Sequence, residues 1–62
     1  MIIKCLDLNK PPHECNAKLY ECNRWLNEYA GEKWTAEWKE NYGYVNIYDL
    51  EVATAFKLKF GL

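Results

Sequence analysis

The chain contains no serine and a single histidine, His13, so it holds few of the groups that nucleophilic catalysis requires. A cysteine or serine nucleophile needs a base within hydrogen-bonding reach and a third group that orients the base. Cys15 with His13 is the one candidate pair, and side chains two residues apart at a helix start point away from each other. A domain this small also has little room for a substrate cleft between paired carboxylates. The sequence therefore predicts a protein that is not an enzyme and that uses no cofactor.

The chain also lacks a Cys-x-x-Cys pair and a glycine-rich loop, since its three glycines stand alone. Zinc needs about four converging ligands, and Cys15 and Cys22 are two helical turns, roughly 10 Å, apart on one predicted helix. We therefore expect no metal site among the possible ligands Cys5, His13, Glu14, Cys15 and Cys22. Three cysteines are an odd number, which is typical of a reducing compartment where thiols pack as small apolar groups.

Neither sign of charge dominates, and no long hydrophobic run is present. The formal net charge is −1, with acidic and basic residues interspersed, so no strong field attracts nucleic acid or anionic lipid. The apolar start of the chain is soon interrupted by Lys4 and Asp7, unlike a signal peptide or a membrane span. We expect a cytoplasmic protein that does not associate with membranes.

Large apolar side chains are abundant instead. Hydrophobic residues make up 50% of the 62 residues and aromatic residues 16%, a composition that favours folding over disorder. Residues 1–62 are predicted to form a single domain. A core of this size supplies about 3–5 kcal/mol, so support from a partner or from a second copy is expected.

The first half of the chain predicts a strand followed by a helix. Residues 1–8 have the aliphatic content of a strand, with apolar residues on both sides, which is typical of a central or helix-covered strand. Pro11 and Pro12 end it and suit the first turn of a helix. An apolar stripe at spacings of four, three, four and three follows, and Gly31 is placed to close the helix. The stripe consists of Cys15, Leu19, Cys22, Leu26 and Tyr29, widened by Trp25.

Two alternating segments then predict a β-hairpin with a turn over residues 39–43. Pairing apolar with apolar residues directs one face against the helix, namely Trp34, Ala36, Trp38, Val45 and Ile47. We expect Trp34 and Trp38 to belong to the core, so that removing either would cost about 3–5 kcal/mol. The opposite face carries Thr35, Glu37, Lys39, Tyr44, Asn46 and Tyr48.

The last segment is predicted to be a helix from Leu50 to about Lys59, with Asp49 as its N-cap. A helical wheel gives one apolar face, made of Val52, Ala53, Phe56 and Phe60. The alternation from Phe56 to Phe60 leaves a strand as the alternative. The order β-α-β-β-α predicts an α+β domain in which a three-stranded sheet carries both helices on one face, a truncated ferredoxin-like arrangement.

Tyrosines on the free sheet face indicate a binding surface. The predicted contact residues are Tyr44, Tyr48, Tyr42, Glu37 and Lys39. We expect a protein partner, because tyrosine anchors protein interfaces. Stacking of single-stranded nucleic acid on Tyr44 and Tyr48 is the alternative, although the acidic neighbours and negative net charge make it less expected. A self-associating assembly component, paired through a strand edge, is a further alternative.

The run DLEVATAFKLKFG, from Asp49 to Gly61, resembles the ends of small uncharacterised proteins of tailed bacteriophages, especially T4-like ones. The resemblance covers about a fifth of the chain and brings no catalytic residues. It implies a small phage-encoded accessory or host-modulating protein, made in the bacterial cytoplasm, that binds a host or phage protein.

Overall fold

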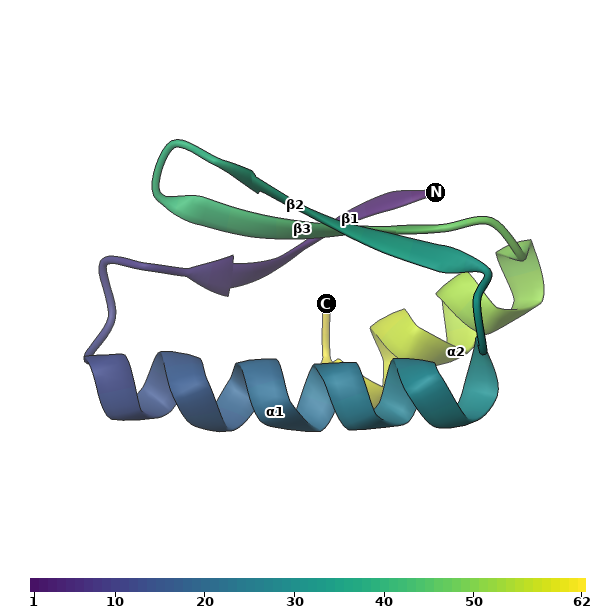
Figure 1. The fold of residues 1–62 in the computed structure, drawn as a ribbon, viewed down its shortest axis with the longest axis horizontal. Coiled ribbons are helices and arrows are strands. Elements are labelled where there is room, and N and C mark those ends of the chain that lie inside the picture. Colours follow the sequence, from purple (N-terminus) through teal and green to yellow (C-terminus); the bar gives the residue numbers. More distant parts are fainter.

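The computed structural model describes all 62 residues. Its elements are β1 (Ile2–Asp7), α1 (Pro12–Tyr29), β2 (Trp34–Lys39), β3 (Tyr42–Ile47) and α2 (Leu50–Phe60). The strands form one sheet in the order β1-β3-β2, and both helices lie on the same side of it (Figure 1). Because β3 is antiparallel to both neighbours, β1 and β2 run parallel to each other on either side of it. The predicted α+β, truncated ferredoxin-like arrangement is confirmed.

β1 is an edge strand, so the expectation of a central strand is wrong, but the helices do cover the inner face of β1. It pairs with β3 alone, and the register shifts between Lys4 and Leu6. This β-bulge inserts Cys5 as an extra residue, so both Cys5 and Leu6 are buried although they are neighbours. Ile2 and Leu8 are exposed. The imperfect alternation of residues 1–8 therefore reflects a bulge, not burial on both faces.

α1 begins at the expected prolines and is followed by Gly31, whose φ of 59° is left-handed as predicted. The predicted apolar stripe is buried only in its middle. Cys22 and Leu26 are buried, whereas Leu19 and Tyr29 are 41% and 58% exposed. Cys15 and Trp25 pack against the same core while only partly buried, so the helix lies on the sheet along one side and leaves Leu19 and Tyr29 uncovered.

The β2–β3 hairpin is tighter than predicted. Lys39 pairs with Tyr42, so the turn is the two-residue segment Glu40–Asn41 and not the five-residue segment 39–43. Glu40 adopts a left-handed φ of 58°, which turns the chain without a glycine. Gly43, expected in the turn, lies within β3 instead.

The predicted inward face of the hairpin is confirmed by the strand register, but its burial is not uniform. Val45 and Ile47 on β3 are buried, whereas Trp34 opposite Ile47 is only partly buried. Trp38 is 52% exposed, so its predicted place in the core is wrong. β2 is an edge strand with no buried residue, because the core lies under β1 and β3.

Trp38 packs across its cross-strand neighbour Gly43. A Cβ atom on Gly43 would lie 2.7 Å from Cζ3 of Trp38 and 3.0 Å from Cβ of Leu6. The missing side chain thus lets the indole lie on the backbone of β3. The ring contacts β3 in this way, while about half of the Trp38 side chain stays exposed.

α2 is a helix to Phe60, so the strand alternative for residues 56–60 is wrong. The Asp49 carboxylate accepts hydrogen bonds from the backbone N–H of Glu51 at 2.9 Å and of Val52 at 3.3 Å, as expected of an N-cap. Gly61 ends the helix with a φ of 68°. Phe56 is fully buried, and its ring centroid lies 5.7 Å from that of Trp25 on α1.

We predict that Phe56→Ala destabilises the protein by about 3–5 kcal/mol, because it removes a fully buried ring and leaves a cavity. This loss is comparable to the whole stability expected of so small a core. Leu58→Ala is the matched control on the same helix, since Leu58 is 80% exposed and its loss should change stability by less than about 0.5 kcal/mol. Urea unfolding followed by circular dichroism measures both, and equal losses would contradict the helical packing of α2.

Candidate functional site

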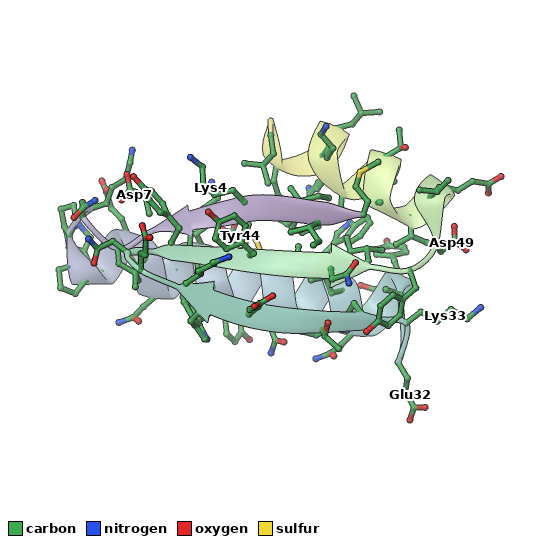
Figure 2. All side chains as sticks on the ribbon, turned by 90° about the horizontal axis from the view of Figure 1, so that it is seen from above. Lys4, Asp7, Glu32, Lys33, Tyr44 and Asp49 are labelled. Atoms are coloured by element: carbon green, nitrogen blue, oxygen red, sulfur yellow. The ribbon has the colours of Figure 1, made fainter.

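The face of the sheet opposite the helices is covered by no element of the fold (Figures 1 and 2). On β3, the residues that alternate with buried Gly43, Val45 and Ile47 point to this side. The uncovered surface, called the tyrosine face here, consists of Tyr42, Tyr44 and Tyr48 with Lys4, Thr35, Glu37, Lys39 and Asn46. Because β3 is the central strand, its tyrosines have neighbours on both sides. Figure 2 shows Tyr44 and Lys4 on this face.

Charged side chains flank the tyrosine rings. Tyr44 lies between Lys4 on β1 and Glu37 on β2 in the strand register. The Nζ atom of Lys4 is 4.6 Å from the ring centroid of Tyr42, a cation–π contact. Basic and acidic groups thus alternate around the rings, so the tyrosine face has no basic track.

The Tyr48 side chain, at the end of the tyrosine face, is fixed by a hydrogen bond from its hydroxyl. It donates a hydrogen bond of 3.3 Å to Oγ1 of Thr35, although the Tyr48 side chain is 58% exposed. Tyr42 and Tyr44 are less exposed than Tyr48, because both lie within the paired part of β3. The three tyrosines are therefore supported by neighbours, and each still offers ring surface to solvent.

All five sequence-predicted contact residues lie on the tyrosine face, namely Tyr42, Tyr44, Tyr48, Glu37 and Lys39. The structure brings them together, and their role in binding stays a prediction. Sequence reasoning missed Lys4, which contributes from β1. Lys4 lies between the buried residues Ile3 and Cys5, and this alternation indicates that its side chain faces away from the core. Only the pairing of β1 with β3 places Lys4 beside Tyr44.

A second exposed surface lies on the helix side of the sheet, between β2 and α1. This β2–α1 groove is lined mainly by apolar residues, with Ala36 and Trp38 on the strand and Leu19 and Asn23 on the helix. Its cavity volume is about 70 Å³, far below the roughly 300–1,000 Å³ of small-molecule sites. The groove is thus a surface feature and has no room for a substrate. Sequence analysis missed it by assigning Trp38 to the core.

The three cysteines are free thiols in different surroundings. Cys5 and Cys22 are buried next to each other, and the hydrogen bond to Cys5 together with burial raises the pKa of the Cys22 thiol well above its usual value. Cys15 is partly buried, and its Sγ donates to the backbone oxygens of Asp7 at 3.2 Å and Lys10 at 3.6 Å. All three thiols are free, and no hydrogen bond joins Cys15 to His13.

The hollow beside Cys15, at the end of β1, has a volume of about 430 Å³ and is lined by both signs of charge. Lys10 and Lys18 lie there with Asp7 and Glu14. No three His, Cys, Asp or Glu side chains are grouped as metal ligands. The volume of this hollow is within the range of small-molecule sites, but its lining mixes both signs of charge and presents no group of metal ligands, so it indicates no particular ligand.

Comparison of the chain with protein-family models, curated proteins and solved structures found no match. Neither helix combines the length and the apolar content needed to cross a membrane. Inference about function therefore rests on the geometry of the tyrosine face and the β2–α1 groove.

We predict that one of the three thiols reacts rapidly with a thiol reagent in the native protein, and that all three react in denaturant. Cys15 is the accessible thiol, whereas Cys5 and Cys22 are buried and react only when the protein opens. Their native reaction should be slower by about a hundredfold or more, given a core of about 3–5 kcal/mol. Cys15→Ala should abolish the rapid phase, and two rapid thiols would contradict the packing of β1 on α1.

Proposed function

We propose that this protein is a non-enzymatic protein-binding module that acts by occupying a surface on its partner through the tyrosine face. The observation that carries the proposal is the row of Tyr42, Tyr44 and Tyr48 on a sheet face that no helix covers. The resemblance of residues 49–61 to phage proteins supports a more specific version. In that version, the protein is a small phage-encoded accessory or host-modulating factor that binds a host or phage protein in the bacterial cytoplasm.

The physical argument for protein binding concerns both energy and entropy. Tyrosine buries a large amphipathic surface with few rotatable bonds, so little side-chain freedom is lost on binding. Tyr42 and Tyr44 are already restricted by pairing on the central strand, and Tyr48 by its hydrogen bond to Thr35. Glu37 and Lys39 on the edge strand supply charges where interfaces usually have a polar rim.

Single-stranded nucleic acid is the second candidate, favoured by the placement of Tyr44 between neighbouring strands with Lys4 beside it. Bases stack on aromatic side chains presented by open sheets. Such sites also need a basic groove that follows the phosphates, and here Glu37 stands opposite Tyr44 while the net charge is −1. The charge pattern therefore supports protein binding more strongly.

We predict that Tyr44→Ala weakens partner binding by about thirtyfold or more, as expected of a central hot-spot tyrosine, while the fold is retained. The measurement is affinity capture from bacterial lysate with mass spectrometry, followed by titration of the captured protein. Tyr20→Ala is the matched control, because Tyr20 is 68% exposed on α1, on the helix side of the sheet.

The proposal requires a protein that is retained by the wild type and by Tyr20→Ala but lost with Tyr44→Ala, with or without nuclease. Capture that disappears on nuclease treatment, together with oligonucleotide binding of steep salt dependence, would favour nucleic acid instead. Retention that is unchanged in Tyr44→Ala and Tyr48→Ala would remove the tyrosine face from either function.

A further inference from the structure

The outer edge of β2 presents a row of backbone groups that have no partner. The carbonyl oxygen of Lys33 accepts a hydrogen bond of 3.0 Å from the N–H of Tyr48, so Lys33 points its backbone groups toward β3. The backbone N–H and C=O groups of successive residues point alternately to the two sides of a strand. Every second residue after Lys33 therefore also bonds to β3, namely Thr35, Glu37 and Lys39. The N–H and C=O groups of the alternate residues therefore point away from the sheet, and these residues are Trp34, Ala36 and Trp38.

The other edge of the sheet is protected. β1 is interrupted by the bulge at Cys5, which disturbs the regular spacing that a pairing strand needs. The carbonyl of Asp7 already accepts the thiol of Cys15 at 3.2 Å, and the Asp7 carboxylate accepts the N–H of Asn9 at 2.9 Å. By contrast, β2 has no bulge and no proline over its six residues, so neither of these two devices blocks pairing, and its charged residues Glu37 and Lys39 lie on the tyrosine-face side.

The free edge of β2 adjoins the apolar β2–α1 groove. Trp38 is 52% exposed and Leu19 is 41% exposed, and both line the groove together with exposed Ala36. A strand added to this edge would therefore gain main-chain hydrogen bonds and at the same time cover apolar side chains. An unpartnered edge and an unpartnered apolar surface coincide at this one place in the fold.

We propose that β2 pairs with β2 of a second copy in antiparallel orientation, with Ala36 opposite Ala36 at a two-fold axis. Trp34, Ala36 and Trp38 of one copy then stand opposite Trp38, Ala36 and Trp34 of the other. This register satisfies the free N–H and C=O groups of all three residues on both copies. The result is a continuous six-stranded sheet in the order β1-β3-β2-β2-β3-β1.

The side chains of β2 argue against centring the axis on Glu37, which would place two carboxylates opposite each other. With Ala36 at the axis, Thr35 stands opposite Glu37 of the other copy on the tyrosine-face side, and the like charges of Lys33 and Lys39 meet only at the two ends of the pairing. On the helix side, the small Ala36 occupies the axis between two indole rings from each copy. The apolar side chains of β2 are thus complementary to those of a second copy, which argues for a second copy as its partner.

Dimerisation about this two-fold axis would also cover the β2–α1 groove. Because the axis is perpendicular to the sheet, the two α1 helices lie on the same side and run antiparallel across it. Leu19 and Trp38 of both copies are then directed into the space between the helices. Dimerisation would add apolar burial that the small core of one chain lacks. The inference concerns the edge and not the tyrosine face, so it stands or fails independently of the proposed function.

The test places a charged side chain at the two-fold axis, positive in one variant and negative in another. Ala36 is exposed and its N–H bonds nothing within the chain, so Ala36→Lys and Ala36→Glu should both fold. Sedimentation equilibrium of the wild type between about 1 µM and 1 mM should show a monomer–dimer equilibrium. Each variant alone should have a dimer Kd raised at least about tenfold, because like charges meet at the axis. An equimolar mixture of the two variants should recover dimer, since lysine then stands opposite glutamate.

Amide hydrogen exchange of the wild type provides a second, mutation-free measurement. Protection of Trp34, Ala36 and Trp38, whose N–H groups are free in the single chain, should rise more steeply with protein concentration than protection of Thr35 and Glu37, which already bond to β3. A wild type that stays monomeric to about 1 mM would overturn the proposal and leave the edge to a different chain. A dimer that is unaffected by Ala36→Lys, or a mixture that recovers no dimer, would overturn this register.

Discussion

The fold depends on one place where the central strand and both helices meet. Ile47 of β3, Leu26 of α1 and Phe56 of α2 are all fully buried and belong to one hydrophobic cluster. The other buried residues of the sheet come from β1 and β3, and β2 contributes none. The core is therefore off-centre beneath the sheet, and β2 is held chiefly by its pairing with β3. The open edge and the apolar groove both follow from this asymmetry.

Local signals in the sequence were sufficient to predict the elements and several of their ends. Asp49 caps α2, Gly31 and Gly61 adopt the left-handed conformation after each helix, and alternation marks the two faces of the hairpin. These features depend on a few neighbouring residues, so they are visible in a single chain. The same signals determined the order of elements and hence the fold class.

Burial was predicted less well because it depends on which strand lies at the edge. Trp38 faces the helix side as its alternation indicates, yet it remains half exposed because no helix lies fully over β2. Cys5 and Leu6 are both buried because of a bulge, which a two-residue period cannot represent. Sequence patterns give the direction of a side chain, whereas its coverage is a property of tertiary packing.

In the candidate site too, the sequence predicts which way a side chain points but not which distant residues lie beside it. Tyr44 and Tyr48 were placed correctly on one face, because each alternates with residues that the core buries, whereas Tyr42 was assigned to the turn and joins them because the turn is shorter than predicted. Lys4 joins them only through the pairing of β1 with β3, a contact between distant parts of the chain. The β2–α1 groove could not be foreseen, since it exists only because the core excludes β2.

The alternation of β2 keeps its two exposed surfaces separate. Thr35, Glu37 and Lys39 extend the tyrosine face, while their neighbours in the strand face the groove. Strand pairing at the edge uses backbone groups that lie in the plane of the sheet, so it covers neither Tyr42 nor Tyr44. Two copies joined through β2 would instead present their tyrosine faces side by side on one sheet. A partner with two matching surfaces would then bind more tightly than either face alone allows, because its second contact is intramolecular.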